Sequence, residues 1–152
     1  MESGKSLGYL LGQSHRVYKN LLIETCKNHG IELTFEQFVI MQMLNSNCDL
    51  IQQDLAEHLQ KDKSIIVRQI NGLLDKNLVT RHTNLDDKRK KNLLLTPKGQ
   101  ALLNDLKEIT SEITGKLLFG IPENEILILR NILAKIQENG AIEENSQTSS
   151  KI

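Results

Sequence analysis

The sequence predicts a mainly helical protein with one small β-hairpin, and two observations predict that class. Apolar residues recur at spacings of three and four in six segments, which is the pattern of amphipathic helices. Between the fourth and fifth segments, two short runs compatible with β-strands flank the polar stretch 84–91. Four helices, a hairpin and two further helices, in this order, predict a winged helix-turn-helix in the middle of the chain.

The first two helices are defined by an apolar stripe and by their ends. The stripe in residues 7–22 predicts a helix that runs to about Asn28, and Gly30 can end it in a left-handed cap. Thr34, followed three residues later by Gln37, predicts a capping box that opens the second helix.

The third and fourth helices are shorter. Leu55, Ala56 and Leu59 lie on one face of the third helix. Asp62 is the expected N-cap of the fourth helix, and Asn77 is its expected left-handed terminator. The stripe of the fourth helix that we expect in the core is Ile66, Ile70, Leu73 and Leu74.

The hairpin is followed by two helices. Its strands are expected at residues 79–83 and 92–96, and Thr96-Pro97 predicts the N-cap and first turn of a fifth helix. Pro122 opens a sixth helix, which Gly140 is expected to close.

The first helix and the last two helices carry apolar stripes that the small middle module cannot wholly cover. Such a stripe is most simply buried against a second copy of the chain, so we expect a homodimer. The alternative is an intramolecular helical bundle. The residues expected at the dimer contact are Leu7, Leu10, Leu11, Leu106, Ile109, Ile113, Leu117, Leu129 and Leu133.

Composition excludes several other classes of protein. A chain of 152 residues can bury its own core, and two cysteines, Cys26 and Cys48, are too few for a disulfide framework. The longest apolar runs are four residues, whereas a membrane-spanning helix needs about 20. The first thirty residues contain no apolar stretch typical of a signal peptide, so we expect a cytoplasmic protein.

The net charge is zero, from 19 basic and 19 acidic residues, but the charges are unevenly distributed. Residues 31–60 carry a net charge of −5 and residues 61–91 carry +5. A basic patch confined to one helix and a hairpin is the electrostatic pattern expected of a nucleic-acid-binding element. The alternative for the basic run 88–91 is an ordinary solvated loop.

The fourth helix has outward residues of the types that contact DNA bases. Arg68 can bind guanine and Asn71 can bind adenine, while Ile65 or Val67 can contact a thymine methyl group. The alternative for Ile65 and Val67 is a place in the core. The expected contacts are Lys63, Ser64, Ile65, Val67, Arg68 and Asn71 on the helix, and Lys88, Arg89, Lys90 and Lys91 on the hairpin.

Several motifs resemble the MarR family of bacterial transcription regulators. The resemblance extends over roughly residues 7–140, and its most specific part is an Asp-x-Arg wing followed by Leu-Thr-x-x-Gly. The motifs are Leu33–Phe38, Asp54–Leu59, Asp62–Arg68, Leu78–Arg81, Asp87–Lys91 and Leu95–Gly99.

This resemblance implies a homodimer bound to a pseudo-palindromic double-stranded DNA operator. It implies that the fourth helix enters a major groove and that Arg89 enters the adjacent minor groove. It also implies that Asp87 orients the wing through an ion pair and that Arg81 belongs to the DNA-binding surface.

The chain departs from the family at three positions. Val67, Gly72 and Asn77 stand where the family commonly has Thr, Arg and Gly. The loss of a polar and a basic contact predicts a different operator sequence, or more reliance on DNA shape and phosphate contacts.

These observations predict one structural domain overall, with four parts. The parts are an N-terminal dimerisation helix (1–32), a winged helix-turn-helix DNA-binding region (33–96), C-terminal dimerisation helices (97–140) and a disordered tail (141–152).

Catalytic and cofactor motifs are absent from the sequence, so we expect no enzyme, no cofactor and no metal. Cys26 with His29, and Asp54 with His58, have the spacing of helical pairs, but a stable metal site needs three or four ligands. The resemblance implies a small-molecule effector, and the alternative for its candidate pocket residues is a core role. Those candidates are Tyr9, His15, Tyr18 and Met43.

The sequence thus predicts a sequence-specific double-stranded DNA-binding transcription regulator, specifically an effector-responsive repressor. The alternative is a dimeric winged-helix module that binds proteins and no operator.

Overall fold

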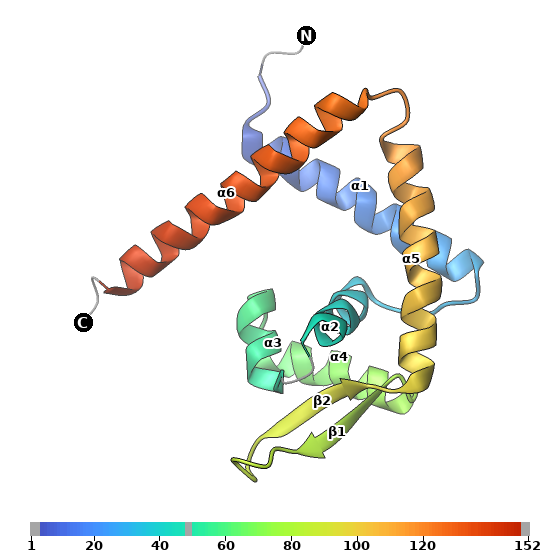
Figure 1. The fold of residues 1–152 in the computed structure, drawn as a ribbon, viewed down its shortest axis with the longest axis vertical. Helices are drawn as coiled ribbons and strands as arrows, with labels where there is room; N and C mark the ends of the chain where they lie inside the picture. The colour runs from blue at the N-terminus through green and yellow to red at the C-terminus, as the bar shows by residue number, and fades with distance from the viewer. Residues whose placement is uncertain (1–3, 48–49, 150–152) are drawn as a thin grey trace. The chain divides into compact units, whose positions relative to one another are not determined.

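The computed structural model describes residues 4–47 and 50–149 (Figure 1). These residues form six α-helices and one two-stranded antiparallel sheet, in the predicted order. The elements are α1 (Leu7–Asn28), α2 (Phe35–Ser46), α3 (Gln52–Leu59), α4 (Lys63–Asp75), β1 (Val79–Thr83), β2 (Lys91–Leu95), α5 (Pro97–Leu117) and α6 (Glu123–Ser149). The predicted fold class is therefore confirmed.

By internal packing the chain divides into two compact units, where the sequence led us to expect one structural domain. The first unit comprises residues 1–113 and holds α1 to α4, the hairpin and most of α5. The second comprises residues 114–152 and holds the end of α5 and α6. In the described part of the chain, no helix is long and apolar enough to cross a membrane.

The core of the first unit takes apolar side chains from every helix of that unit and from both strands. On α4, Ile66, Ile70 and Leu73 are fully buried, as the apolar stripe predicts. Leu74 is half-buried and packs against the same core.

Part of the stripe on α5 also lies in this core, which corrects one prediction. Leu106 and Ile113 are fully buried and Ile109 is 6% exposed, although all three were expected at a contact with a second copy. Because side chains of the same unit already cover this part of α5, these residues are not available to a partner chain.

The ends of the helices follow the predicted chemistry. Thr34 and Gln37 form the capping box, in which each side chain bonds the other residue's backbone N–H at 3.1 Å. Thr96 Oγ1 accepts from the Gly99 N–H (3.0 Å) at the start of α5. Gly30 (φ +72°) and Asn77 (φ +56°) adopt the left-handed conformation expected of terminators.

Two predicted ends differ from the structure. Asp62 stands at the N-cap of α4, but its side chain makes no capping hydrogen bond. The sixth helix does not end at Gly140, because α6 continues to Ser149. A glycine inside a helix costs only about 1 kcal/mol relative to alanine, and the residues that follow, 141–144, favour helix. Residues 141–149 of the expected disordered tail are thus helical, and 150–152 lie outside the described residues.

The hairpin forms the wing. Its register pairs Val79 with Leu95 at one end and Thr83 with Lys91 at the other. An isolated bridge joins Ile51 to Asn92, so the segment before α3 adds to the edge of β2. β2 starts one residue earlier than expected and ends at Leu95, because Thr96 serves as the cap of α5.

Candidate nucleic-acid interface

The outward face of α4 is polar and basic. Lys63, Ser64, Arg68 and Asn71 are exposed, and the opposite face supplies the buried stripe. Ile65 and Val67 are half-buried, so they lie at the border between the two faces. A helix with this division can place its polar face against another molecule without disturbing the core.

A side-chain hydrogen bond joins this face to the first strand of the wing. Arg81 Nη2 on β1 donates to Asn71 Oδ1 on α4 at 3.1 Å. The helix and the wing therefore share one polar surface. A bidentate contact between Asn71 and adenine needs that same oxygen as an acceptor, so Arg81 would have to release it.

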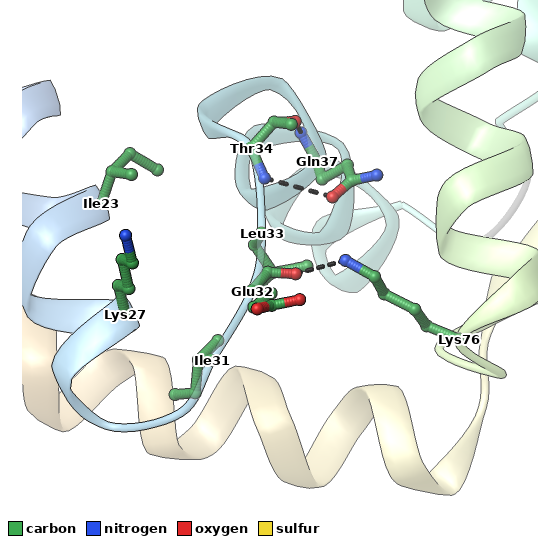
Figure 2. Close-up of a pocket in the computed structure, with 8 residues that line it drawn as sticks. All are labelled: Ile23, Lys27, Ile31, Glu32, Leu33, Thr34, Gln37 and Lys76. Carbon is green, nitrogen blue, oxygen red and sulfur yellow. Dashed lines mark hydrogen bonds between the residues drawn. The ribbon is translucent and has the colours of Figure 1, made fainter.

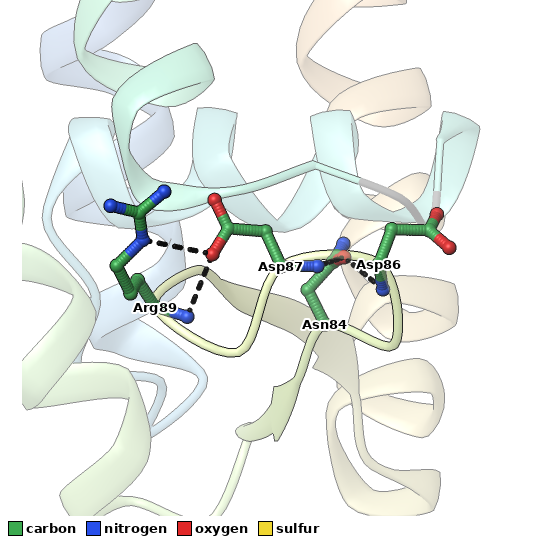
Figure 3. Close-up of polar contacts among 4 residues, drawn as sticks. All are labelled: Asn84, Asp86, Asp87 and Arg89. Carbon is green, nitrogen blue, oxygen red and sulfur yellow. Dashed lines mark hydrogen bonds and ion pairs between the residues drawn. The ribbon is translucent and has the colours of Figure 1, made fainter.

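The loop at the tip of the wing is held by short-range hydrogen bonds (Figure 3). Asn84 Oδ1 accepts from the backbone N–H groups of Asp86 and Asp87, at 2.9 Å each. Asn84 Nδ2 donates to Asn92 Oδ1 (2.8 Å), which anchors the loop to β2. An asparagine in this position satisfies turn N–H groups that would otherwise need water.

Asp87 holds Arg89 through two hydrogen bonds, one to its backbone and one to its side chain. One carboxylate oxygen, Oδ1, accepts from the backbone N–H of Arg89 (3.0 Å) and from its Nε (3.2 Å), as Figure 3 shows. The backbone bond, the side-chain bond and the charge of Lys90 lower the pKa of Asp87. The Arg89 side chain is 92% exposed, and its bonds to Asp87 use the backbone N–H and Nε, so neither terminal nitrogen takes part in them.

The other basic residues of the wing are arranged differently. Lys88 and Lys90 are exposed at the tip. Lys91 is exposed too, but its Nζ donates to Thr83 Oγ1 across the hairpin (2.8 Å). Lys91 thus stabilises the strand pair as well as adding charge to the wing.

Gly72 on α4 is explained by a buried glutamine. Gln37 is 5% exposed, and its Nε2 donates to the Gln69 backbone oxygen at 3.3 Å. A Cβ atom at position 72 would lie 2.5 Å from that Nε2. A larger side chain at this position therefore conflicts with Gln37, which accounts for one of the three departures from the MarR pattern.

The four candidate pocket residues come from two helices, α1 and α2. Tyr9, His15 and Tyr18 lie on α1. The centroid of the His15 ring lies 5.2 Å from that of the Phe35 ring, in an edge-to-face arrangement. Met43 instead lines a pocket of about 450 Å³ between α2 and α3.

Cys26, His29 and Asp54, which belong to the two candidate metal-ligating pairs, have structural roles. Cys26 is buried, and burial raises the pKa of its thiol. His29 Nδ1 lies 2.9 Å from the Thr25 carbonyl oxygen, and Asp54 Oδ2 accepts from the Ile51 N–H (2.8 Å). Across the described ranges, no three His, Cys, Asp or Glu residues gather as a metal site. Cys48 lies outside the described residues.

The remaining residues predicted for dimerisation lie in the first half of α1, at the end of α5 and in α6. Leu133 is half-buried, and the others are large apolar side chains that this chain leaves exposed. Those exposed residues are Leu7, Leu10, Leu11, Leu117 and Leu129.

Three helices, α2 to α4, followed by a two-stranded wing define a winged helix-turn-helix protein, and here both α4 and the wing present basic residues. Residues 33–91 match the model of the MarR family. The resemblance seen in the sequence is thereby confirmed for this segment.

The fold extends the likeness along most of the chain. A MarR transcriptional regulator from Methanosarcina mazei Go1 has a TM-score of 0.81 at 26% identity, over 89% of this chain and 96% of that one. Wild-type MarR from E. coli, in its apo form, has 0.78 at 22% identity, over 89% and 98%. A further MarR crystal structure has 0.87 at 18% identity, over 96% and 98%. The last two likenesses concern the fold alone.

Proposed function

We propose that this chain is a cytoplasmic, homodimeric transcription regulator that binds a pseudo-palindromic double-stranded DNA operator. It acts as a repressor that a small-molecule effector releases, and it is no enzyme. The observation that carries the proposal is the continuous polar surface of α4 and the wing, joined by the Arg81–Asn71 bond. Lys63, Arg68, Arg81 and the basic run 88–91, all of them exposed, lie on this surface.

The geometry supports a division of labour between the two elements. α4 enters the major groove, where Arg68 contacts a base edge and Lys63 a phosphate. The wing follows the backbone into the adjacent minor groove and presents Arg89 there. Because Asp87 already holds Arg89 by its Nε, little side-chain freedom is lost when the terminal nitrogens bind DNA.

Dimerisation would set the separation of the two α4 helices. Two half-sites about one helical turn apart on the same DNA face require a fixed distance between the two helices. The exposed leucines of α1, α5 and α6 supply apolar surface for that contact. An effector that favours a wrongly spaced dimer lowers operator affinity, with a coupling of typically 1–3 kcal/mol.

The salt dependence of duplex binding tests this proposal. Fragments bound by the protein are first selected from genomic DNA of the source organism, and their affinity is then measured by fluorescence anisotropy. Affinity should fall steeply with salt as phosphate contacts release counterions. Arg89→Ala should weaken binding and leave the unfolding midpoint unchanged, because the side chain is exposed.

The matched control is Lys135→Ala, which removes one positive charge from α6 and none from the wing. It should bind DNA as the wild type does. Failure of the wild-type protein to bind any duplex at low salt would contradict the proposal and favour the protein-interaction module. Unchanged affinity of Arg89→Ala would discard the role given to the wing.

A further inference from the structure

Leu85 lies in the loop between β1 and β2, at the tip of the wing, and its side chain is 98% exposed. Among the described residues, every other exposed large apolar side chain lies on α1, α5, α6 or the segment between α5 and α6. Those elements carry the apolar surface proposed for the dimer contact, whereas the wing belongs to the surface proposed to bind DNA. The dimer contact therefore gives no account of Leu85.

The backbone on both sides of Leu85 is held by hydrogen bonds. The Asn84 N–H donates to the Lys90 carbonyl oxygen (3.1 Å), which closes the loop. Asn84 Oδ1 accepts from the Asp86 N–H (2.9 Å), as Figure 3 shows, and the Lys90 N–H donates to the Asp87 carbonyl oxygen (2.9 Å). The loop thus presents the leucine on a fixed backbone, so little backbone freedom is lost when the tip of the wing binds a partner.

The charges beside Leu85 favour a polyanion as that partner. Lys88, Arg89 and Lys90 are exposed in the same loop, and one of its two carboxylates, that of Asp87, is engaged with Arg89. Proteins that bind the minor groove of DNA combine basic side chains with apolar side chains inserted between base steps, and leucine is one of those used. A single leucine offers less apolar area than one acyl chain, which itself binds membranes only marginally. The combination of residues therefore favours DNA over a lipid surface.

We propose that Leu85 is an apolar wedge that enters the minor groove with Arg89 and partly unstacks a pyrimidine–purine step. The inference rests on the proposed function. Pyrimidine–purine steps such as TA are flexible and easily unstacked, so the energy needed to open a step depends on its sequence. Leu85 therefore gives the operator a sequence preference without a hydrogen bond to any base, in addition to the contacts of α4.

2-Aminopurine, an adenine analogue whose fluorescence rises when it unstacks, is the probe for the wedge. It replaces each adenine of both strands in turn, in a duplex that the protein has selected from genomic DNA. At saturating protein, the wild type should raise the fluorescence at one position in each half-site. Leu85→Ala should abolish this rise, whereas Leu85→Met, which keeps a long apolar side chain, should retain it.

Affinity and salt dependence separate the wedge from the charges. Leu85→Ala should weaken binding to the selected duplex by about tenfold, because most of the apolar surface of the leucine is no longer buried. The loss should be much smaller on a duplex with a purine–pyrimidine step in that place, where the wild type gains little. The slope of log affinity against log salt should stay unchanged in Leu85→Ala, whereas Arg89→Ala, which removes a cation, should reduce it by about one.

Ile142→Ala is the matched control, because it shortens an exposed apolar side chain on α6. It should bind every duplex as the wild type does. The Leu85 side chain lies outside the core, so Leu85→Ala should unfold in urea at the wild-type midpoint. A loss of duplex affinity at unchanged stability is then a loss of DNA contact.

Three outcomes would overturn the wedge. They are equal affinity of the wild type and Leu85→Ala, an equal loss of affinity on every base step, and no fluorescence rise at any position. Binding to phosphatidylglycerol vesicles that depends on Leu85, with duplex affinity unaffected, would assign the residue to a lipid surface instead. A wild-type protein that binds no duplex at low salt would refute the proposed function and the wedge with it, whereas duplex binding without an effect of Leu85 would refute the wedge alone.

Discussion

Gln37 shows how one buried polar side chain determines its neighbours. Its amide completes the capping box with Thr34 and also bonds the Gln69 backbone on α4. These two bonds fix the amide where a side chain at position 72 would begin. The capping box was predictable because its residues are three apart in sequence. The contact with Gly72 was not predictable, because it joins elements far apart in the chain.

Gly72→Ala should destabilise the protein by about 1–2 kcal/mol, because displacing the Gln37 amide leaves buried polar groups unsatisfied. In a Gln37→Ala background the clash is gone, so the same change should stabilise by up to ~1 kcal/mol through helix propensity. Urea unfolding of the wild type, both single variants and the double variant measures the coupling. If the effects of the two substitutions are additive, the Gln37 side chain is not the reason why a glycine occupies position 72.

Asp87 should titrate below the ordinary carboxyl pKa of 3.8. Because its folded pKa is lowered, the bonds to Arg89 should persist above that ordinary value and disappear only as the pH falls through the lowered pKa. A ¹³C NMR titration of the carboxyl group measures this midpoint. In Arg89→Ala the midpoint should rise only partway, since the backbone N–H, which is the larger cause, remains. A midpoint at or above 3.8 in the wild type would contradict the observed geometry.

At the scale of the elements, helices and strands were predictable because their signals are local. An apolar period, a capping residue and a left-handed terminator such as Asn77 all lie within a few residues of each other. Gly140 misled the prediction because a helical glycine weakens a helix without ending it. The bridge between Ile51 and Asn92 had no local signal, since it pairs residues about forty positions apart.

α4 gives a prediction that separates base contacts from phosphate contacts. Arg68→Ala should relax the preference at one operator position and cost about 1–3 kcal/mol there. Competition among duplexes that vary one base pair at a time measures this preference. An equal loss of affinity on every duplex would instead make Arg68 a phosphate contact.

For the whole molecule, the zero net charge is a cancellation between neighbouring segments. Residues 61–91, which include α4 and the wing, carry a net charge of +5, whereas residues 31–60, which include α2 and α3, carry −5. The acidic helices reduce long-range attraction to any duplex, so non-specific binding should be modest. Specific contacts from the α4 and wing surface then have to supply more of the operator affinity.

The sequence predicted the candidate DNA surface, whereas it did not predict the cavity of about 340 Å³ in the first unit (Figure 2). Arg68 and Arg89 belong to short contiguous motifs, so their exposure followed from one helix and one loop. The cavity with Lys27 and Lys76 is built from α1, a linker, α2 and the end of α4. Residues that meet only through tertiary packing leave no periodic signal in the sequence, so this cavity could not be predicted from it.

The apolar stripes of the helices serve two purposes in the whole molecule: some residues form the core, and others are proposed to contact a second copy of the chain. A pair of leucine variants can test this division. Leu10 on α1 is 49% exposed, whereas Leu106 on α5 is fully buried. Leu10→Asp should therefore give a folded monomer, since it places a charge on the proposed dimer surface. Leu106→Ala should lower the free energy of unfolding by about 2–5 kcal/mol through the cavity it leaves, and any folded protein should remain dimeric.

Sedimentation velocity and urea unfolding together distinguish these results. An intact dimer for Leu10→Asp would move the interface to other exposed residues, of which Leu129 on α6 is the next to test. A folded monomer for Leu106→Ala would show that this part of α5 supports the dimer after all. The two residues are both leucines and differ in exposure. Loss of the dimer in Leu10→Asp together with loss of stability in Leu106→Ala would therefore assign the α1 stripe to the dimer contact and the α5 stripe to the core.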